Sequence, residues 1–131
     1  MQQALKILIV CKSRPDYLHY RTILEGNNNR IHGAGNSFEA LRLFNTHHAR
    51  QAPFDLVMLE YILSGRMTGI ELAELFIKTY PAVRLLFFPS AHLFEQEVRQ
   101  QYRAMEANLL EPNLSQAGLR QIMQELRGQK R

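Results

Sequence analysis

Four short apolar runs, each followed by polar residues or a proline, constrain most strongly what this chain can fold into. The runs cover residues 5–10, 54–59, 83–88 and 107–110. They are continuous rather than alternating, which is typical of parallel strands that are covered on both faces. Residues 30–34 form a weaker strand pattern, second in chain order. The sequence therefore predicts five buried parallel strands.

Helical patterns with recognisable start signals lie between these runs. Ser13, Asn36 and Thr68 each occupy an N-cap position and are followed three residues later by an acidic residue. Apolar residues also recur at helical spacing from Phe94 to Met105 and from Leu119 to Leu126, and we interpret both stripes as core packing. The order (βα)5 predicts an α/β fold: a doubly wound, five-stranded parallel sheet of flavodoxin-like type.

Length and composition predict one globular domain. The chain has 131 residues, of which 46% are hydrophobic and 21% charged. No apolar run approaches the roughly 18 residues of a membrane span, and the start of the chain does not resemble a signal peptide. The single cysteine, Cys11, excludes an internal disulfide and fits a reducing compartment. We expect a single cytoplasmic domain over residues 1–131, with a core at about 5–126 and a short basic tail.

The net charge of +4 raises the question of a polyanionic partner. Apart from the tail at residues 127–131, the basic residues are spread along the chain. There is no basic stripe flanked by aromatic residues, and no recognition-helix motif. We favour a solvated tail and expect no nucleic-acid contact. A basic nucleic-acid-binding module remains the alternative, and its affinity would fall steeply with the logarithm of the salt concentration.

The chemistry of the chain depends on the residues that follow the predicted strands, because open parallel sheets bind ligands at the carboxyl ends of their strands. These residues are Cys11, Lys12, Glu60, Pro89, Ser90 and Glu111. The set holds one cation and two carboxylates. It argues against a divalent-metal site and for side chains that pair with one another.

From roughly Leu5 to Leu126, the chain resembles the receiver domain of bacterial two-component response regulators. The strongest segment is residues 54–72, which in that family holds a strand, the phosphoacceptor aspartate, a loop and the glycine that opens the third helix. Shorter supporting segments share the family's apolar pattern: residues 7–10, 37–41 and 108–112. The resemblance implies the receiver fold and a place in bacterial signal transduction.

The resemblance also implies that the family's phosphorylation chemistry is lost. At four of the family's functional positions another residue stands: Cys11 and Lys12 for the acidic pair that binds Mg²⁺, Glu60 for the phosphoacceptor, Glu111 for the lysine, and Asn108 for the aromatic switch residue. Pro89 or Ser90 takes the place of the family's Thr/Ser, and only Ser90 would retain its hydroxyl. Mg²⁺ prefers carboxylate oxygens, and a cation at Lys12 would repel it. We therefore expect no Mg²⁺, no other cofactor, no catalytic residue and no enzymatic activity.

Lys12 stands where the family has an acid, and Glu111 stands where it has a lysine. The charges around Glu60, in the family's phosphorylation pocket, are thus exchanged. We hypothesise that Lys12 bridges the two carboxylates, and the alternative is drift to three solvated side chains. A weaker hypothesis is that Glu60 mimics the charge of a phosphorylated aspartate. With Asn108 at the switch position, we expect a locked conformation rather than a two-state switch.

Cysteine and histidine offer two further hypotheses. Lys12 would lower the thiol pKa of Cys11 and favour a redox sensor, although a buried free cysteine is usually a small hydrophobic residue, which is the interpretation that we favour. His47 and His48 could bind metal or phosphate. Adjacent helical residues point in different directions, so we interpret them as solvated histidines at a helix end.

The resemblance places partner binding on the face formed by the fourth helix, fifth strand and fifth helix. Residues that we expect to be exposed there are Glu95, Arg99, Arg103, Glu106 and Gln121. We expect a signalling protein as partner, such as a histidine kinase or a downstream regulator, or a homodimer through the same face. A receiver that a histidine kinase still phosphorylates is the alternative to a protein-interaction adaptor.

Overall fold

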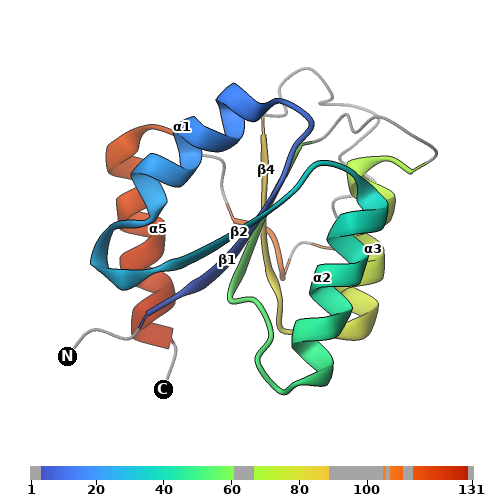
Figure 1. Ribbon diagram of the computed structural model, residues 1–131. Helices are drawn as coiled ribbons and strands as arrows, with labels where there is room; N and C mark the ends of the chain where they lie inside the picture. The colour runs from blue at the N-terminus through green and yellow to red at the C-terminus, as the bar shows by residue number, and fades with distance from the viewer. Residues whose placement is uncertain (1–3, 61–66, 89–104, 106, 111–113, 130–131) are drawn as a thin grey trace.

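The computed structural model describes residues 4–60, 67–88, 105, 107–110 and 114–129. Within these residues, strands alternate with helices, and a four-stranded parallel sheet has the order β2-β1-β3-β4 (Figure 1). The strands are five residues long: β1 Lys6–Val10, β2 Arg30–Ala34, β3 Leu56–Glu60 and β4 Arg84–Phe88. The weak pattern at residues 30–34 is thus confirmed as a strand.

The register of the sheet brings the carboxyl ends of the strands to one edge. Val10 of β1 pairs with Ala34 of β2 and with Leu59 of β3. Glu60 pairs with Phe88 at the end of β4. Because all pairings are parallel, the residues that follow β1 and those that end β3 lie near one another.

The first three helices, α1, α2 and α3, begin at the predicted caps. The helices are α1 Arg14–Leu24, α2 Ser37–Ala49, α3 Gly69–Thr79 and α5 Gln116–Gln129. The Ser13 hydroxyl accepts a hydrogen bond from the backbone amide of Asp16, and the Asn36 carboxamide accepts one from that of Glu39. Thr68 forms a complete capping box at the start of α3. These bonds satisfy amide groups that lack partners within the helix.

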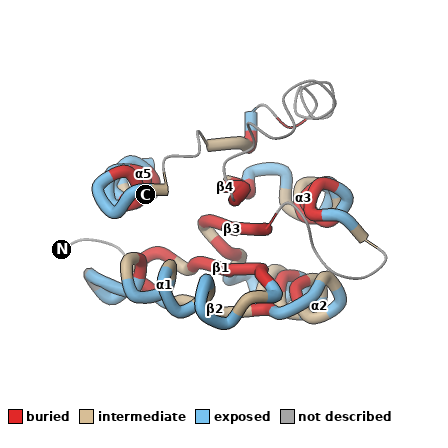
Figure 2. Tube along the Cα trace, turned by 90° about the horizontal axis from the view of Figure 1, so that it is seen from above, coloured by how far each residue is buried: buried red, intermediate tan, exposed pale blue. Residues whose placement is uncertain are grey.

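Helices cover both faces of the sheet, as Figure 2 shows from above. Side chains alternate along each strand, so the sheet separates two apolar clusters. One cluster joins Val10 and Leu59 to α2 and α3, and the other joins Ile9 and Met58 to α1 and α5. This burial on both faces explains why the strands read as continuous apolar runs.

The expected fifth strand is not formed as a strand among the described residues. Residues 107–110 run parallel to β4 but make only an isolated bridge, between Leu85 and Leu109. Leu85 donates its amide to the carbonyl of Asn108, and Leu110 donates to that of Leu85, each at 2.8 Å. Two bonds around one residue are too few for a ladder. Among the described residues, the sheet therefore has four strands, and the predicted fifth is present only as this bridge.

The expected fourth helix falls on residues 94–105, of which only Met105 is described. Met105 is buried in the cluster that contains α2 and α3, as its place in an apolar stripe suggests. Among the described helices, none has the length and hydropathy that crossing a membrane would require.

Candidate functional site

Cys11, Lys12 and Glu60 come together at the carboxyl edge of the sheet. Glu60 is the last residue of β3, and Cys11 directly follows β1. Both are buried, with exposed fractions of 8% and 5%. The alternation along the strands directs both side chains toward α1 and α5. A carboxylate and a thiol therefore occupy the place where the receiver family has its acidic residues.

The Glu60 carboxylate is held by the backbone rather than by a cation. Its Oε1 atom accepts a hydrogen bond from the backbone amide of Lys12 at 3.4 Å. The Lys12 side chain is exposed, and its ammonium forms no ion pair with Glu60. An exposed ammonium keeps its hydration and gains little from a single carboxylate. The Lys12–Glu60 half of the hypothesised bridge was therefore wrong, and Glu111 lies outside the described residues.

Cys11 is a poor nucleophile in this structure. Its Sγ atom lies 3.4 Å from the carbonyl oxygen of Ser13, to which the thiol donates. Burial, followed by the negative charges of Glu60 and Asp16, raises the pKa of the Cys11 thiol to about 11, and the contact with Ser13 opposes this increase. Lys12, which we expected to lower the thiol pKa, is not among the causes of the shift. The redox-sensor hypothesis is therefore not supported. Cys11 acts as a small buried residue.

The described residues at this edge do not fit the Mg²⁺ ion that the receiver family holds there. Mg²⁺ needs oxygen ligands in octahedral geometry. Glu60 supplies one carboxylate, while Cys11 supplies a protonated sulfur and Lys12 a cation. In the described ranges, no three His, Cys, Asp or Glu side chains gather into a metal-binding group. We derive no reaction through a metal at this edge.

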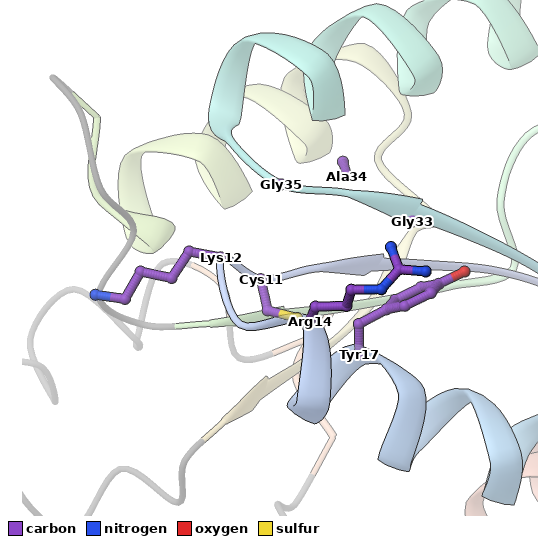
Figure 3. Close-up of a pocket in the computed structure, with 7 residues that line it drawn as sticks. All are labelled: Cys11, Lys12, Arg14, Tyr17, Gly33, Ala34 and Gly35. Atoms are coloured by element: carbon purple, nitrogen blue, oxygen red, sulfur yellow. The ribbon is translucent and has the colours of Figure 1, made fainter.

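A hollow of about 280 Å³ opens beside Cys11, between the amino end of α1 and the end of β2 (Figure 3). Its lining residues are Cys11, Lys12, Arg14, Tyr17, Gly33, Ala34 and Gly35. In Figure 3 the Arg14 and Tyr17 side chains lie beside Gly33, whereas Lys12 extends away. A Cβ atom on Gly33 would lie 2.5 Å from Cε1 of Tyr17, so the glycine makes room for the ring.

Lys12 and Arg14, the two cationic residues that line this hollow, do not make it an anion-binding site. The charges that act most strongly on Cys11, at its base, are the carboxylates of Glu60 and Asp16. At its rim, the Gly35 amide already donates to the Glu39 carboxylate at 3.2 Å. A ligand phosphate would have to compete with these groups, and we assign no ligand to the hollow.

Asn108 lies at the amino edge of the sheet, where the strands begin, whereas Cys11 and Glu60 lie where the strands end. Its Nδ2 atom donates to the carbonyls of Pro81 at 2.7 Å and of Val83 at 2.8 Å, just before β4. The residue is buried, with 8% of its surface exposed. Two short bonds hold the carboxamide in place, so this side chain ties the segment 107–110 to the sheet.

Several predicted site residues lie outside the described residues. These are Pro89, Ser90 and Glu111 of the degenerate pocket, and Glu95, Arg99, Arg103 and Glu106 of the predicted partner face. Gln121 of that face is described and is exposed on α5. The roles of all these residues remain predictions.

The histidines of α2 pack inward, contrary to the solvated arrangement that we expected. The His47 ring lies 4.8 Å from that of His32 on β2 and 4.8 Å from that of Phe54. His48 contacts Tyr80, and its Nδ1 atom is buried without a hydrogen-bond partner. His47 continues the inward stripe of α2 through Ala40 and Phe44, and this spacing could have indicated its direction. Nothing in the sequence indicated its contact with His32.

Comparison with known proteins shows which fold this is. No family model and no curated protein matches the chain. Among solved structures, the receiver domain of Francisella response regulator 1452 superposes with a TM-score of 0.75 at 17% identity, covering 97% of this chain and 99% of that one. A receiver domain protein from Clostridium thermocellum gives 0.73 at 17%, covering 96% of both chains. A CheY-like protein from Methanospirillum hungatei gives 0.74 at 20%, covering 98% of both. The chain therefore has the response-regulator receiver fold.

Proposed function

We propose that this chain is a protein-interaction module of two-component signal transduction that works without phosphorylation of the receiver type. The fold supports a signalling role by analogy, since folds are shared by proteins of different function. The residues at the carboxyl edge support the second part of the proposal. On this view the protein is an adaptor in the cytoplasm rather than an enzyme.

One observation carries the proposal: the Glu60 carboxylate is bonded to the Lys12 amide, with Cys11 and Lys12 in place of the metal-binding acids. Phosphoryl transfer depends on positioning and on neutralising the charge of the phosphoryl oxygens. Without a carboxylate pair to hold a cation, that charge stays uncompensated. The extra methylene of Glu60 also displaces the attacking oxygen by about 1 Å relative to an aspartate, which can cost about a hundredfold in rate.

Incubation with acetyl phosphate and Mg²⁺, followed by mass spectrometry of the intact chain, tests the proposal. We expect no phosphoryl adduct. A stable adduct on Glu60 would overturn the proposal and support a phosphorylated receiver. As a matched variant, the combined substitution Cys11→Asp, Lys12→Asp and Glu60→Asp rebuilds the acidic set. Calorimetric titration should then show Mg²⁺ binding that the unmodified chain lacks.

The partner side of the proposal is tested separately. Immobilised protein should retain a histidine kinase or a downstream regulator from the native cell extract, identified by mass spectrometry. Charge reversal at Arg99 and Arg103, together with Gln121→Glu on α5, should abolish this retention if the proposed face is used. Retention unchanged by these substitutions would contradict the face, and light scattering of the same variants would show whether the chain forms a homodimer there.

A further inference from the structure

Two histidines from distant parts of the sequence meet on the α2 side of the sheet. His32 lies on β2, the edge strand, and His47 lies in the last turns of α2. The two elements are neighbours in Figures 1 and 2. Their imidazole rings are 4.8 Å apart between centroids, at an interplanar angle of 67°. Neither residue is part of the edge that holds Cys11 and Glu60.

The separation of the rings matches that of two imidazoles on one metal ion. A metal–nitrogen bond of about 2.0–2.1 Å, with the nitrogen about 1 Å from its ring centre, places two centroids about 4.5–5 Å apart at tetrahedral or octahedral angles. The observed 4.8 Å lies within this range. The spacing of the two rings is therefore compatible with one shared ion.

Both imidazoles are available as ligands. Within the described part of the chain, neither ring makes a hydrogen bond, and both residues are half-buried rather than sealed from solvent. Burial, followed by the charge of Lys6, lowers the pKa of both histidines. Metals bind the neutral form of imidazole.

The surroundings set the strength of such a site. The Lys6 ammonium donates to the carbonyl of Ala52 at 2.8 Å and lies 5.4 Å from the Phe54 ring centre, close enough to oppose a cation. In the part of the chain that the structure describes, no third His, Cys, Asp or Glu joins the pair. A bound ion would keep water in its other positions, so binding would be weak and readily exchanged.

We propose that His32 and His47 form a two-histidine binding site for a divalent transition metal, filled best by Cu²⁺ and less well by Ni²⁺ or Zn²⁺. Imidazole nitrogen suits these metals, and Cu²⁺ has the highest affinity among the divalent ions of the first row. Mg²⁺, which prefers oxygen ligands, does not bind there. The site is independent of the proposed signalling role and of the edge that holds Glu60.

Titration of the whole chain with CuCl₂, followed by electron paramagnetic resonance and calorimetry, tests this site. We expect one Cu²⁺ per chain with nitrogen hyperfine coupling. We expect His32→Asn and His47→Asn each to lower the affinity at least tenfold, and His19→Asn, on the exposed side of α1, to leave it unchanged. Equal affinity of the unmodified chain and of the chain with both His32→Asn and His47→Asn would overturn the site, as would a failure of the unmodified chain to bind Cu²⁺.

A measurement on the unmodified chain guards against variants that fail to fold. Substoichiometric Cu²⁺ should broaden the amide signals of residues 31–33 and 46–48 in a ¹H–¹⁵N correlation spectrum before all others. Broadening that begins near His19 or the end of the chain would show that the two rings only pack against Phe54 and hold no metal.

Discussion

The amino edge of the sheet, where the parallel strands begin, and its carboxyl edge, where they end, are built differently. At the amino edge, short hydrogen bonds tie strands to side chains: Leu5 donates its amide to Asn29 at 3.0 Å, and Lys6 donates to Asp55 at 2.8 Å. Asn108 adds two more bonds at this edge. At the carboxyl edge, the corresponding bond from Lys12 to Glu60 is 3.4 Å long.

This difference indicates how the chain divides its polar residues between stability and other roles. Parallel sheets place ligands at their carboxyl edge, where the surface must remain adaptable. Buried carboxamides with several partners stabilise a fold because an unpaired partner is costly. We therefore expect substitutions at the amino edge to affect stability most, and those at the carboxyl edge to affect it little.

The largest effect is expected from Asn108→Asp. The substitution keeps the size of the side chain but replaces the donating amide with an oxygen that faces the carbonyls of Pro81 and Val83. The buried carbonyl of Val83 and the part-buried carbonyl of Pro81 lose their donor, so the free energy of unfolding should fall by about 2–4 kcal/mol. Urea denaturation followed by circular dichroism measures it. Asn45→Asp, on the exposed side of α2, is the control, and equal effects of the two would contradict the comparison.

The next effect concerns the reactivity of Cys11 at the carboxyl edge. The thiol pKa of about 11, against an ordinary 9.0, makes the thiolate about a hundredfold rarer at neutral pH. Alkylation by iodoacetamide should be slower than in the urea-unfolded chain by at least this factor. Its rate should increase as the pH rises toward 11, because the thiol then ionises. A rate at neutral pH equal to that of the unfolded chain would show that Cys11 is activated after all.

A smaller effect is expected from Gly33→Ala, which tests the packing beside the hollow. The added methyl group meets the Tyr17 ring at 2.5 Å, and this half-buried ring must move. The unfolding free energy should fall by about 1–2 kcal/mol. Adding Tyr17→Ala should remove the penalty of the methyl group. A penalty that persists in the double variant would assign the cost to the strand backbone rather than to the ring.

The smallest effect is expected from Glu60→Gln. The carboxamide oxygen that this change introduces can still accept from the Lys12 amide, and the cost of burying a charge disappears. The unfolding free energy should stay constant or rise by less than about 1 kcal/mol in urea denaturation. Lys12→Met should be equally mild. A loss above about 2 kcal/mol in either variant would reveal an ion pair at this edge and reverse the comparison between the two edges.

Most of the fold could be predicted from the sequence because its signals are local. Ser13, Asn36 and Thr68 cap helices through bonds to residues three positions later. The apolar strands are continuous because helices cover both faces of the sheet. The predicted fifth strand is only a bridge among the described residues, because a ladder depends on how many residues pair with β4. At 107–110, the pattern of apolar residues does not determine that number.

The candidate site could be predicted only as a set of positions. The parallel register makes the meeting of Cys11, Lys12 and Glu60 a consequence of where each strand ends. The direction of the Lys12 side chain was wrong in the bridge hypothesis, and the lowered Cys11 pKa was wrong in the redox-sensor hypothesis, whereas the favoured interpretation of Cys11 as a small buried residue is confirmed. Both depend on burial and on charges across the chain, since Asp16 and Glu60 act on Cys11 through space.

The sequence by itself determined the alternation of elements, the helix starts and the residues at the carboxyl edge, because each follows from neighbours along the chain. Only the tertiary structure decided that Glu60 bonds to a backbone amide, that Asn108 ties two segments together, and that His32 meets His47. Such contacts join residues that are far apart in the chain. Their free energy depends on distance and on exposure to water, which appear only when the elements pack.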